Sequence, residues 1–458
     1  PEAPMPDMPP EAPPPDDDGP PPTEFDGALA EQDDAPPGAT PRRRRDPDPD
    51  LAVSVQLARP SRVVNGIDVL GRPFPSGVNI ETVLTHDTRW KKWLRYNEFL
   101  GRVEVDGKPR SDVLDTKAAL WLHRVYDIEA TTERVAEVLR YVAETHRRFD
   151  PLKDYLRSLS WDGVRRVDTI LQRAFAVETP DVADGDQLVS ALARVFFVSA
   201  VARALAPGCK VDTQLVLVGT QGKGKSTALA ALVPHRAWFA DSQIDMHSKD
   251  RFQALDGVWI YENSEMDMLK GAALSRLKGF LSSQVDRYRR PWDRHTEEHP
   301  RRTVFVGSTN EREFVDDPTG LRRFLALHVR DNGTMDIATI VAERDQLWAE
   351  AVAAFDQGVP WHLEPAAADA MATHSEGYRI VNPWEDSIGS FLDDPERVLV
   401  ERVLGFHVND VLAFLNIPHD RRQDTRLAMR VTAILAAAGC TKRRMRVETR
   451  PQWRWFRP

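Results

Sequence analysis

The feature that most constrains this chain is an eight-residue loop, 219–226 (GTQGKGKS), which fits the pattern G-x-x-x-x-G-K-[ST] at every fixed position. An apolar run at 214–219, typical of a buried strand, leads into the loop, and an apolar helical stretch follows it. Glycines let such a loop curl until successive backbone N–H groups point at phosphate oxygens. The pattern places Lys225 to reach the outer phosphates of a nucleotide and the Ser226 hydroxyl to ligate Mg²⁺. The predicted nucleotide-binding residues are Gly219, Thr220, Gln221, Gly222, Lys223, Gly224, Lys225, Ser226 and Thr227.

Four apolar segments of strand type follow one another around this loop, at 214–219, 257–263, 302–310 and 323–329, with helical or polar stretches between them. Strands that alternate with helices build a parallel sheet that helices cover on both faces. We therefore predict an α/β nucleotide-binding core over 185–335, followed by a helical segment over 336–395.

Two of these segments end in polar residues. Glu262 lies at the end of the second segment, Glu265 follows it, and Asn310 ends the third. A carboxylate on the strand that neighbours the loop strand would hold Mg²⁺ or its water, and a second carboxylate would polarise the attacking water. The Asn310 amide would orient that water. The alternatives are two surface glutamates after a buried strand, and an Asx-type turn that closes the next strand.

A pair of arginines, Arg322 and Arg323, comes just before the fourth segment. One interpretation is an arginine finger that stabilises transition-state charge across a subunit boundary. The other is an ion pair with Asp316 or Asp317 in the preceding loop. The order of carboxylate strand, polar-tipped strand and arginine fits an oligomeric ATPase of the additional-strand type better than a small-molecule kinase.

A basic segment lies between the glutamates and Asn310, and two aromatic residues, Tyr288 and Trp292, are interleaved with its cations. Cations can neutralise backbone phosphates, and aromatic rings can stack on bases. A solvated surface loop is the alternative, because charge runs usually are solvated. The predicted DNA-binding residues are Lys278, Arg287, Arg289, Arg290, Arg294 and His295.

The composition separates the 458-residue chain into unlike parts. Residues 1–50 hold 16 prolines and 14 Asp/Glu against four arginines, so this tail is expected to be disordered and accounts for the acidic net charge of −9. Its Arg42 to Arg45 run is either a solvated stretch or a nucleic-acid contact. The two cysteines, Cys209 and Cys440, support neither a zinc site nor a disulfide framework, and a reducing cytoplasm is the expected compartment. The apolar stretch 188–205 contains Arg194 and Arg203, so we expect a core helix and no membrane span. The side chains of both arginines are expected to leave the apolar core.

The flanking regions have weaker signals. Residues 51–184 are predicted to form a mixed, mainly helical module, in which the stretch after Thr131 places Val135, Val138, Leu139 and Val142 on one helix face. Residues 396–458 contain a helix that stops at Gly439 and then a basic, alternating strand pair, a pattern compatible with a small winged-helix-like module.

Several separate motifs together resemble the virulence-associated protein E (VapE) family. These are P-loop proteins of phages, prophages and phage satellites, related to superfamily-three helicases and to the primase–helicases of mobile elements. The motifs that carry the resemblance, in the family's order, are FDPLKDYLRSLSWDGVRRVD (149–168), APGCKVDTQLVLVGTQGKGKST (206–227), LKGFLSSQVDRYRRPWDR (277–294), HPRRTVFVGSTN (299–310) and DPTGLRRF (317–324).

The resemblance implies an α/β P-loop NTPase core of the AAA+ or superfamily-three helicase type that uses ATP and Mg²⁺. It implies single-stranded or forked DNA as a partner and a homo-oligomer, expected to be a hexameric ring. It also implies that a DNA-contacting hairpin falls within 278–300. This chain departs from the family at Leu321, where members mostly have Asn, and in the Glu262-x-x-Glu265 spacing, which leaves open which glutamate binds Mg²⁺. Residues 51–150 show no primase pattern, so if a primase exists, it lies upstream or on another chain.

Two further functions are compatible with the same residues. A signalling or defence ATPase would bind a protein partner without translocating, and the acidic tail would then be its docking arm. A nucleotide-gated scaffold would bind DNA through the C-terminal KRRMRVETRPQWRWF, although its alternating Val447, Trp453 and Trp455 also suit an ordinary sheet edge.

Overall fold

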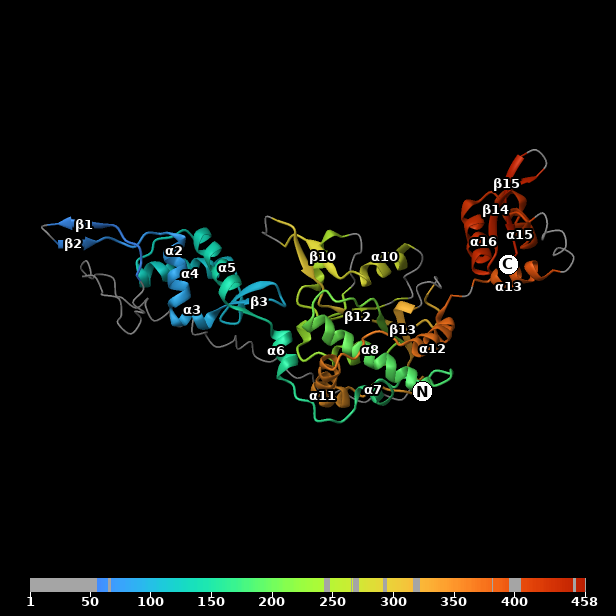
Figure 1. Ribbon diagram of the computed structural model, residues 1–458, viewed down its shortest axis with the longest axis horizontal. Coiled ribbons are helices and arrows are strands. Elements are labelled where there is room, and N and C mark those ends of the chain that lie inside the picture. The colour runs from blue at the N-terminus through green and yellow to red at the C-terminus, as the bar shows by residue number, and fades with distance from the viewer. Residues whose placement is uncertain are drawn as a thin grey trace, which may run out of the picture.

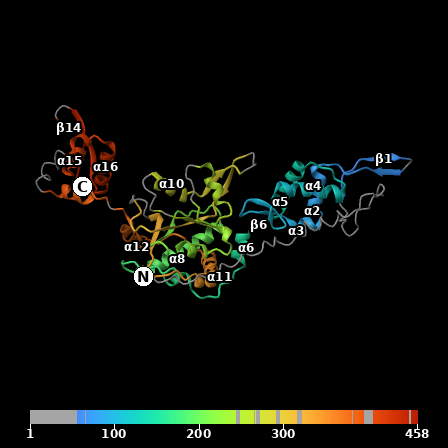
Figure 2. The same cartoon turned by 180° about the vertical axis from the view of Figure 1, so that it is seen from behind.

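The computed structural model arranges the chain as three successive units, each with its own buried apolar core (Figure 1). The first helices and the β1–β2 hairpin lie at one end, a parallel sheet with its helices lies in the middle, and the C-terminal helices and hairpin lie at the other end. Figure 2 shows the same order from behind. The structure describes residues 56–64, 67–242, 248–264, 266, 272–290, 295–315, 322–380, 382–394, 405–447 and 450–457.

The N-terminal unit packs helices against a small mixed sheet. Its elements are β1 (Ser61–Val64), β2 (Ile67–Leu70), α2 (Gly77–His86), α3 (Thr88–Trp93), β3 (Leu94–Asn97), β4 (Arg102–Val105), β5 (Lys108–Pro109), α4 (Asp112–Tyr126), α5 (Thr132–His146) and β6 (Arg148–Phe149). The Thr131 hydroxyl caps α5, and the face predicted to be apolar is buried. At the centre of this core, Trp90 lies edge-on to Trp93 and Trp121, with ring centroids 6.0 and 5.6 Å away.

The middle unit is built on a five-stranded sheet in the order β13-β7-β12-β9-β8, in which every neighbouring pair is parallel. Its strands are β7 (Gln214–Val218), β8 (Phe239–Ala240), β9 (Ile260–Asn263), β12 (Val304–Thr309) and β13 (Phe324–His328). The four strands predicted from apolar segments are therefore present in one parallel sheet. Their spatial order differs from the chain order, because β12 lies between β7 and β9. The prediction that the glutamate strand neighbours the loop strand is wrong, since one strand separates them.

Both faces of this sheet are buried, and alternate residues of each strand point to opposite sides. In β7, Leu215 and Leu217 belong to one core cluster, whereas Val216 and Val218 belong to the other. The same alternation continues in β9, β12 and β13. This double burial explains why the strands read as continuous apolar runs in the sequence.

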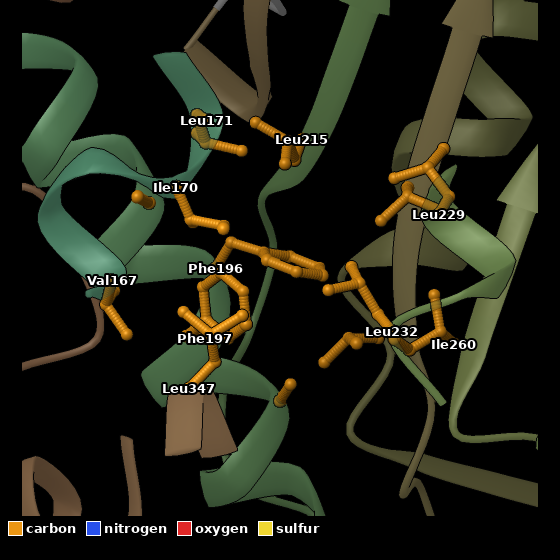
Figure 3. Packing of buried hydrophobic residues seen from close by; sticks show 14 of the residues in the cluster. Val167, Ile170, Leu171, Phe196, Phe197, Leu215, Leu229, Leu232, Ile260 and Leu347 are labelled. Atoms are coloured by element: carbon orange, nitrogen blue, oxygen red, sulfur yellow. The ribbon is translucent and has the colours of Figure 1, made fainter. Parts of the chain in front are cut away.

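Helices supply the larger of the two cores. They are α6 (Pro151–Ser158), α7 (Val167–Arg173), α8 (Gly185–Leu205), α9 (Lys225–Ala230), α11 (Ile337–Asp356) and α12 (Pro365–Ser375). Figure 3 shows Phe196 and Phe197 of α8 packed with Leu215 of β7 and Ile170 of α7. The opposite core lies under α10 (Ala272–Leu281), which buries Leu274 and Leu277.

Helix α8 is long and apolar enough to cross a membrane by composition, but 78% of its most apolar window is buried inside the protein. A helix that is hydrophobic on all sides and surrounded by protein is a core helix. Arg194 leaves this core and pairs with Asp168 at 2.8 Å. The prediction that Arg203 also leaves the core is wrong, because this residue is 1% exposed. Its guanidinium donates to the carbonyls of Val211, Ser283 and Arg301 at 2.9, 3.2 and 3.3 Å. Burial lowers the pKa of Arg203 to about 10.

The N-terminal unit joins the middle unit through the segment after β3. The Phe99 ring lies edge-on to Trp238 at 5.6 Å, and the Arg302 guanidinium lies 5.2 Å from the same ring. Leu152 and Val167 belong to the larger core together with α8. This core is therefore continuous across the boundary that the sequence suggested between 184 and 185.

The C-terminal unit consists of helices followed by a hairpin of its own. Its elements are α13 (Glu385–Asp393), α15 (Val408–Phe414), α16 (Thr425–Ala437), β14 (Thr441–Val447) and β15 (Arg450–Phe456). Gly439, at φ +78°, follows α16 in a left-handed conformation that suits glycine. The helix and the strand pair expected from the sequence are thus present, while the assignment of this unit as a winged helix stays a prediction.

Candidate nucleotide site

The glycine-rich loop begins where β7 ends, at the carboxyl edge of the sheet. Gly222 and Gly224 adopt φ values of +82° and +78°, a left-handed conformation that L-residues with a Cβ rarely take. Helix α9 starts at Lys225, directly after Gly224. Thr220, Gln221, Gly222, Ser226 and Thr227 are exposed, so the mouth of the loop faces solvent. Loop and helix are arranged as the sequence pattern requires.

Lys225 is 8% exposed, and its ammonium is held by oxygen atoms at the carboxyl edge. Its Nζ donates to the carbonyls of Gly219 and Thr220 at 2.6 and 2.9 Å and to Asn310 Oδ1 at 3.1 Å. Burial lowers the pKa of Lys225, and the nearby Glu262 carboxylate acts in the opposite direction. The contact brings together two residues, 85 positions apart, that the sequence predicted for one site.

Glu262 lies at the centre of a second group of polar contacts. The carboxylate is 1% exposed, and its Oε1 accepts from Ser226 Oγ at 2.8 Å and from Ser308 Oγ at 2.6 Å. Its other oxygen, Oε2, is buried and has no hydrogen-bond partner among the residues that the structure describes. A buried carboxylate oxygen without a partner is costly unless a ligand completes it. A hydroxyl beside a carboxylate is a donor set that suits Mg²⁺, which keeps several waters and phosphate oxygens as further ligands.

Ser308 is the site residue that the sequence reading missed. It lies on β12, between the loop strand β7 and the glutamate strand β9, and is 7% exposed. A small hydroxyl residue inside an otherwise apolar strand was the available signal, because buried polar side chains need a partner. Its partner is Glu262, so Ser308 positions that carboxylate.

The remaining residues predicted for the nucleotide site are more dispersed. Lys223 Nζ contacts the backbone carbonyl of Asp331 and lies 3.5 Å from that of Gly333, so this lysine ties the loop to the segment after β13. Glu265 lies outside the described residues, and its predicted role stays a prediction. In the part of the chain that the structure describes, no group of three or more His, Cys, Asp or Glu side chains could hold a metal by itself.

Arg322 and Arg323 lie at the amino ends of the strands, whereas the loop lies at their carboxyl ends. They precede Phe324, which pairs with Gln214 at the start of β7, whereas the loop follows Val218 at the end of β7. At ~3.3 Å per residue, the arginines and the loop are about 20 Å apart along the strands. Arg322 is exposed, and Arg323 has a buried Nε without a hydrogen-bond partner within the described part of the chain. Neither side chain can reach the loop of its own chain, and Asp316 and Asp317 lie outside the described residues.

The basic segment forms an antiparallel hairpin of β10 (Val285–Tyr288) and β11 (Glu297–Pro300). Carboxylates compensate much of its charge: Arg287 pairs with Glu298 at 2.5 Å, and Arg290 lies 3.3 Å from Asp256. The sequence analysis considered only the cations of this segment and did not consider these acidic partners.

The predicted DNA contacts differ in exposure. Lys278 is 8% exposed in α10, and this burial contradicts a direct contact between its ammonium and DNA. Arg287, Arg289 and His295 are exposed, while Arg290 is half-buried and raised in pKa by its partner Asp256 despite the opposing effect of burial. Arg294 and Trp292 lie outside the described residues.

The chain is similar to known proteins over part of its length. Residues 156–380 match the model of the Virulence-associated protein E-like domain. No curated protein is significantly similar to the chain. The similar solved structures include the A form of the apo NrS-1 C-terminal region, at 14% identity over 66% of this chain and 77% of that one, with a TM-score of 0.39. A second apo structure of that region has 15% identity over 66% and 77%, with a TM-score of 0.36, and a further A-form structure has 15% over 66% and 78%, with 0.37. The matched residues 156–380 contain the glycine-rich loop, Glu262 and Asn310.

Proposed function

We propose that this chain is an ATP-dependent replication ATPase of a phage, prophage or mobile element, which couples hydrolysis to DNA unwinding or origin remodelling. The observation that carries the proposal is the pair of contacts made by β12. Asn310 meets Lys225 at 3.1 Å, and Ser308 meets Glu262 at 2.6 Å. The inserted strand therefore places its polar end between the loop and the acidic residue, where a hydrolytic water and a terminal phosphate would meet.

Each residue then has a role that follows from its position. Backbone N–H groups of 219–226 would cradle the phosphates, and Lys225 would exchange its carbonyl contacts for phosphate oxygens. Ser226 and Glu262 would hold Mg²⁺, which supplies charge neutralisation at the phosphates when bound. The partnerless Glu262 Oε2 supports this assignment. Asn310 would orient the water, and Glu265 is a further candidate for polarising it.

The position of the arginines supports the proposal of a ring. Because Arg322 and Arg323 lie about 20 Å from the loop of their own chain along β7 and β13, they could act on a nucleotide only across a subunit boundary. A homo-oligomer, with a hexamer as the expected form, would bring the arginines of one subunit to the loop of the next.

Subunit mixing tests this arrangement. The variant Arg322→Ala/Arg323→Ala and the variant Lys225→Ala should each hydrolyse ATP poorly, since a trans-acting arginine contributes roughly 10³–10⁵-fold to turnover. Mixing the two inactive variants should restore activity, because a subunit with an intact Lys225 then meets one with intact arginines. Phosphate release by the mixture is the measurement. A mixture no more active than its components, at concentrations where light scattering shows a common oligomer, would contradict action in trans.

The DNA partner is supported by the exposed Arg287, Arg289 and His295 on the β10–β11 hairpin. Arg289 is the informative position, because Arg287 already has Glu298 as a partner and Arg290 holds Asp256. Reversal of Arg290 would break the attachment of the hairpin, so any loss of DNA binding would be ambiguous.

Stimulation of ATP hydrolysis by DNA tests the coupling. Wild-type protein should hydrolyse ATP faster with single-stranded or forked DNA and should unwind a forked duplex only with ATP. Arg289→Glu should lose most of that stimulation and still bind a fluorescent ATP analogue. Arg165→Glu, a reversal at an exposed arginine in the same domain, is the control and should behave as wild type. If no DNA stimulates the wild type although ATP is hydrolysed, unwinding is excluded and a protein-directed signalling ATPase becomes the better account.

A further inference from the structure

The C-terminal unit differs in charge from the rest of the chain. Residues 405–458 contain 11 Lys/Arg against four Asp/Glu, a net charge of +7 in a chain whose total is −9. Seven of these cations fall in the 441–457 segment, which contains one acidic residue, Glu448. A concentration of one sign of charge on one element attracts a polyanion.

Six of these cations belong to a hairpin that is a two-stranded sheet by itself, and Arg457 directly follows it. β14 and β15 pair from Thr441↔Phe456 to Val447↔Arg450. Within the described residues the hairpin has one further backbone bridge, between Phe406 and Trp455 at its base. It is therefore not an edge strand of a larger sheet, and Figure 1 shows it projecting beyond the helices of the unit. We call this hairpin the C-terminal ribbon.

Two tryptophans on the same face of the ribbon have opposite environments. Trp455 is 5% exposed and packs with Phe406 in the core of the unit. Trp453, two residues earlier in β15, is 55% exposed. The alternation that suggested an ordinary sheet edge predicts that both rings are buried. This holds for Trp455, but the ring of Trp453 does not pack on the core and faces solvent.

Cations surround the exposed ring. Arg444 is exposed and lies directly opposite Trp453 in the strand register, where side chains point to the same face. Lys442 Nζ lies 5.6 Å from the Trp453 ring and 5.9 Å from the Trp455 ring. Arg443 is exposed on the other face. A flat aromatic ring beside cations offers two kinds of contact together, stacking for a base and charge for neighbouring phosphates.

We propose that the C-terminal ribbon is a binding site for a single nucleic-acid strand, in which Trp453 stacks on an unpaired base while Lys442, Arg443 and Arg444 neutralise neighbouring phosphates. An unpaired strand fits better than a duplex, because stacking on a side chain requires a base whose face is free. The site is separate from the nucleotide site and from the β10–β11 hairpin, and it needs no nucleotide.

The test is the binding of a fluorescent oligothymidylate to the full chain, without ATP, measured by fluorescence anisotropy over a series of salt concentrations. The Lys225→Ala protein serves as the parent, so that the result does not depend on hydrolysis. Trp453→Ala should weaken binding about 5- to 150-fold, the equivalent of ~1–3 kcal/mol for one stacked base. Arg444→Glu should also weaken binding, and Arg444→Ala should lower the slope of log affinity against log salt by about 0.7 for one lost phosphate contact.

Matched controls lie on helix α5 of the N-terminal unit. Tyr141 is 50% exposed, and Arg134 is exposed, so Tyr141→Ala and Arg134→Glu repeat the same chemical changes away from the ribbon. Both should bind as the parent does. If the ribbon variants bind no more weakly than these controls, the proposal is overturned.

Two competitors decide the identity of the ligand. A duplex of the same length should compete less well than the single strand, and equal competition with no effect of Trp453→Ala would overturn the stacking role. Polyglutamate of matched charge should compete poorly. If polyglutamate displaces the strand as well as unlabelled oligothymidylate does, the ribbon is an acidic-polypeptide site and the proposal fails. If the wild-type protein hydrolyses no ATP while Trp453→Ala still weakens binding of the strand, the proposed function is refuted and this inference stands.

Discussion

Replacement of Lys225 by alanine is expected to reduce ATP hydrolysis by roughly 10²–10³-fold, the usual cost of removing one preorganised group that stabilises developing charge. The reason lies in the position of the ammonium. It is buried at the carboxyl edge and already held by three oxygen acceptors, among them Asn310 Oδ1. It contacts both the glycine-rich loop, through Gly219 and Thr220, and Asn310 at the end of β12. Phosphate release under saturating Mg-ATP is the measurement.

The same loop provides the control. Lys223 carries the same charge two positions earlier, but its ammonium contacts the carbonyls of Asp331 and Gly333 and not the residues of the candidate site. Lys223→Ala should therefore stay within a few-fold of wild type. An equal loss in both variants would show that the total charge of the loop matters and that the specific contact of Lys225 does not.

Ser308→Ala extends this series. It removes one of the two hydroxyls that donate to Glu262, and a hydrogen bond to a charged group contributes ~1.5–3 kcal/mol. If that energy is expressed fully in the transition state, turnover falls roughly 10- to 150-fold. Nucleotide affinity should change less than turnover, because Ser308 positions a carboxylate and does not itself lie on the loop.

The second large effect is expected on stability. Arg301→Ala should lower the free energy of unfolding of the middle unit by about 3–5 kcal/mol, because it leaves the buried Asp286 carboxylate without its counter-charge. Arg301 and Asp286 are 1% and 5% exposed, and two hydrogen bonds of 2.8 and 2.5 Å join them. The guanidinium also lies 4.5 Å from the Phe280 ring. Urea denaturation followed by tryptophan fluorescence measures the change.

A second ion pair of the β10–β11 hairpin is the matched control. Arg287 and Glu298 are 74% and 60% exposed, so Arg287→Ala should cost no more than about 1 kcal/mol. The double variant Asp286→Leu/Arg301→Met should recover most of the lost stability, since two apolar side chains can replace a buried pair. If Arg301→Ala is no more destabilising than Arg287→Ala, the buried pair does not hold the base of the hairpin.

Much of the middle unit could be predicted from sequence because its signals are local. An apolar run followed by a glycine-rich turn indicates a strand that ends at a loop, and polar residues at strand ends gather at one edge of a parallel sheet. Glu262 and Asn310 were predicted in this way to lie near the loop, and they contact Ser226 and Lys225, while their roles stay predictions. The spatial order of the strands could not be found, because nothing in the chain order states that β12 enters between β7 and β9. Ser308 was missed for that reason, since its role exists only through its neighbour in the sheet.

The errors in the basic segment have a related cause. The sequence shows how many cations a segment contains, but their partners come from elsewhere in the fold. Arg290 holds Asp256, 34 residues away, and its guanidinium approaches the hydroxyl of Tyr96 in the N-terminal unit. Lys278 belongs to a helix whose inner face covers the sheet, so its charge is buried. A count of charges therefore overestimated the cationic surface of the hairpin.

The path of the chain through β12 has a mechanical consequence. Arg301, which anchors the base of the hairpin, is followed within three residues by Val304, and the same strand runs without a break to Thr309, next to Asn310. An extended strand is already near its maximum length and cannot stretch. If Asn310 shifts along the strand axis, Arg301 at the base of the hairpin must therefore shift with it. Such a shift would otherwise break the hydrogen bonds that β12 makes to β7 and β9. Strand β12 thus links the base of the β10–β11 hairpin to the candidate nucleotide site through a segment that cannot lengthen.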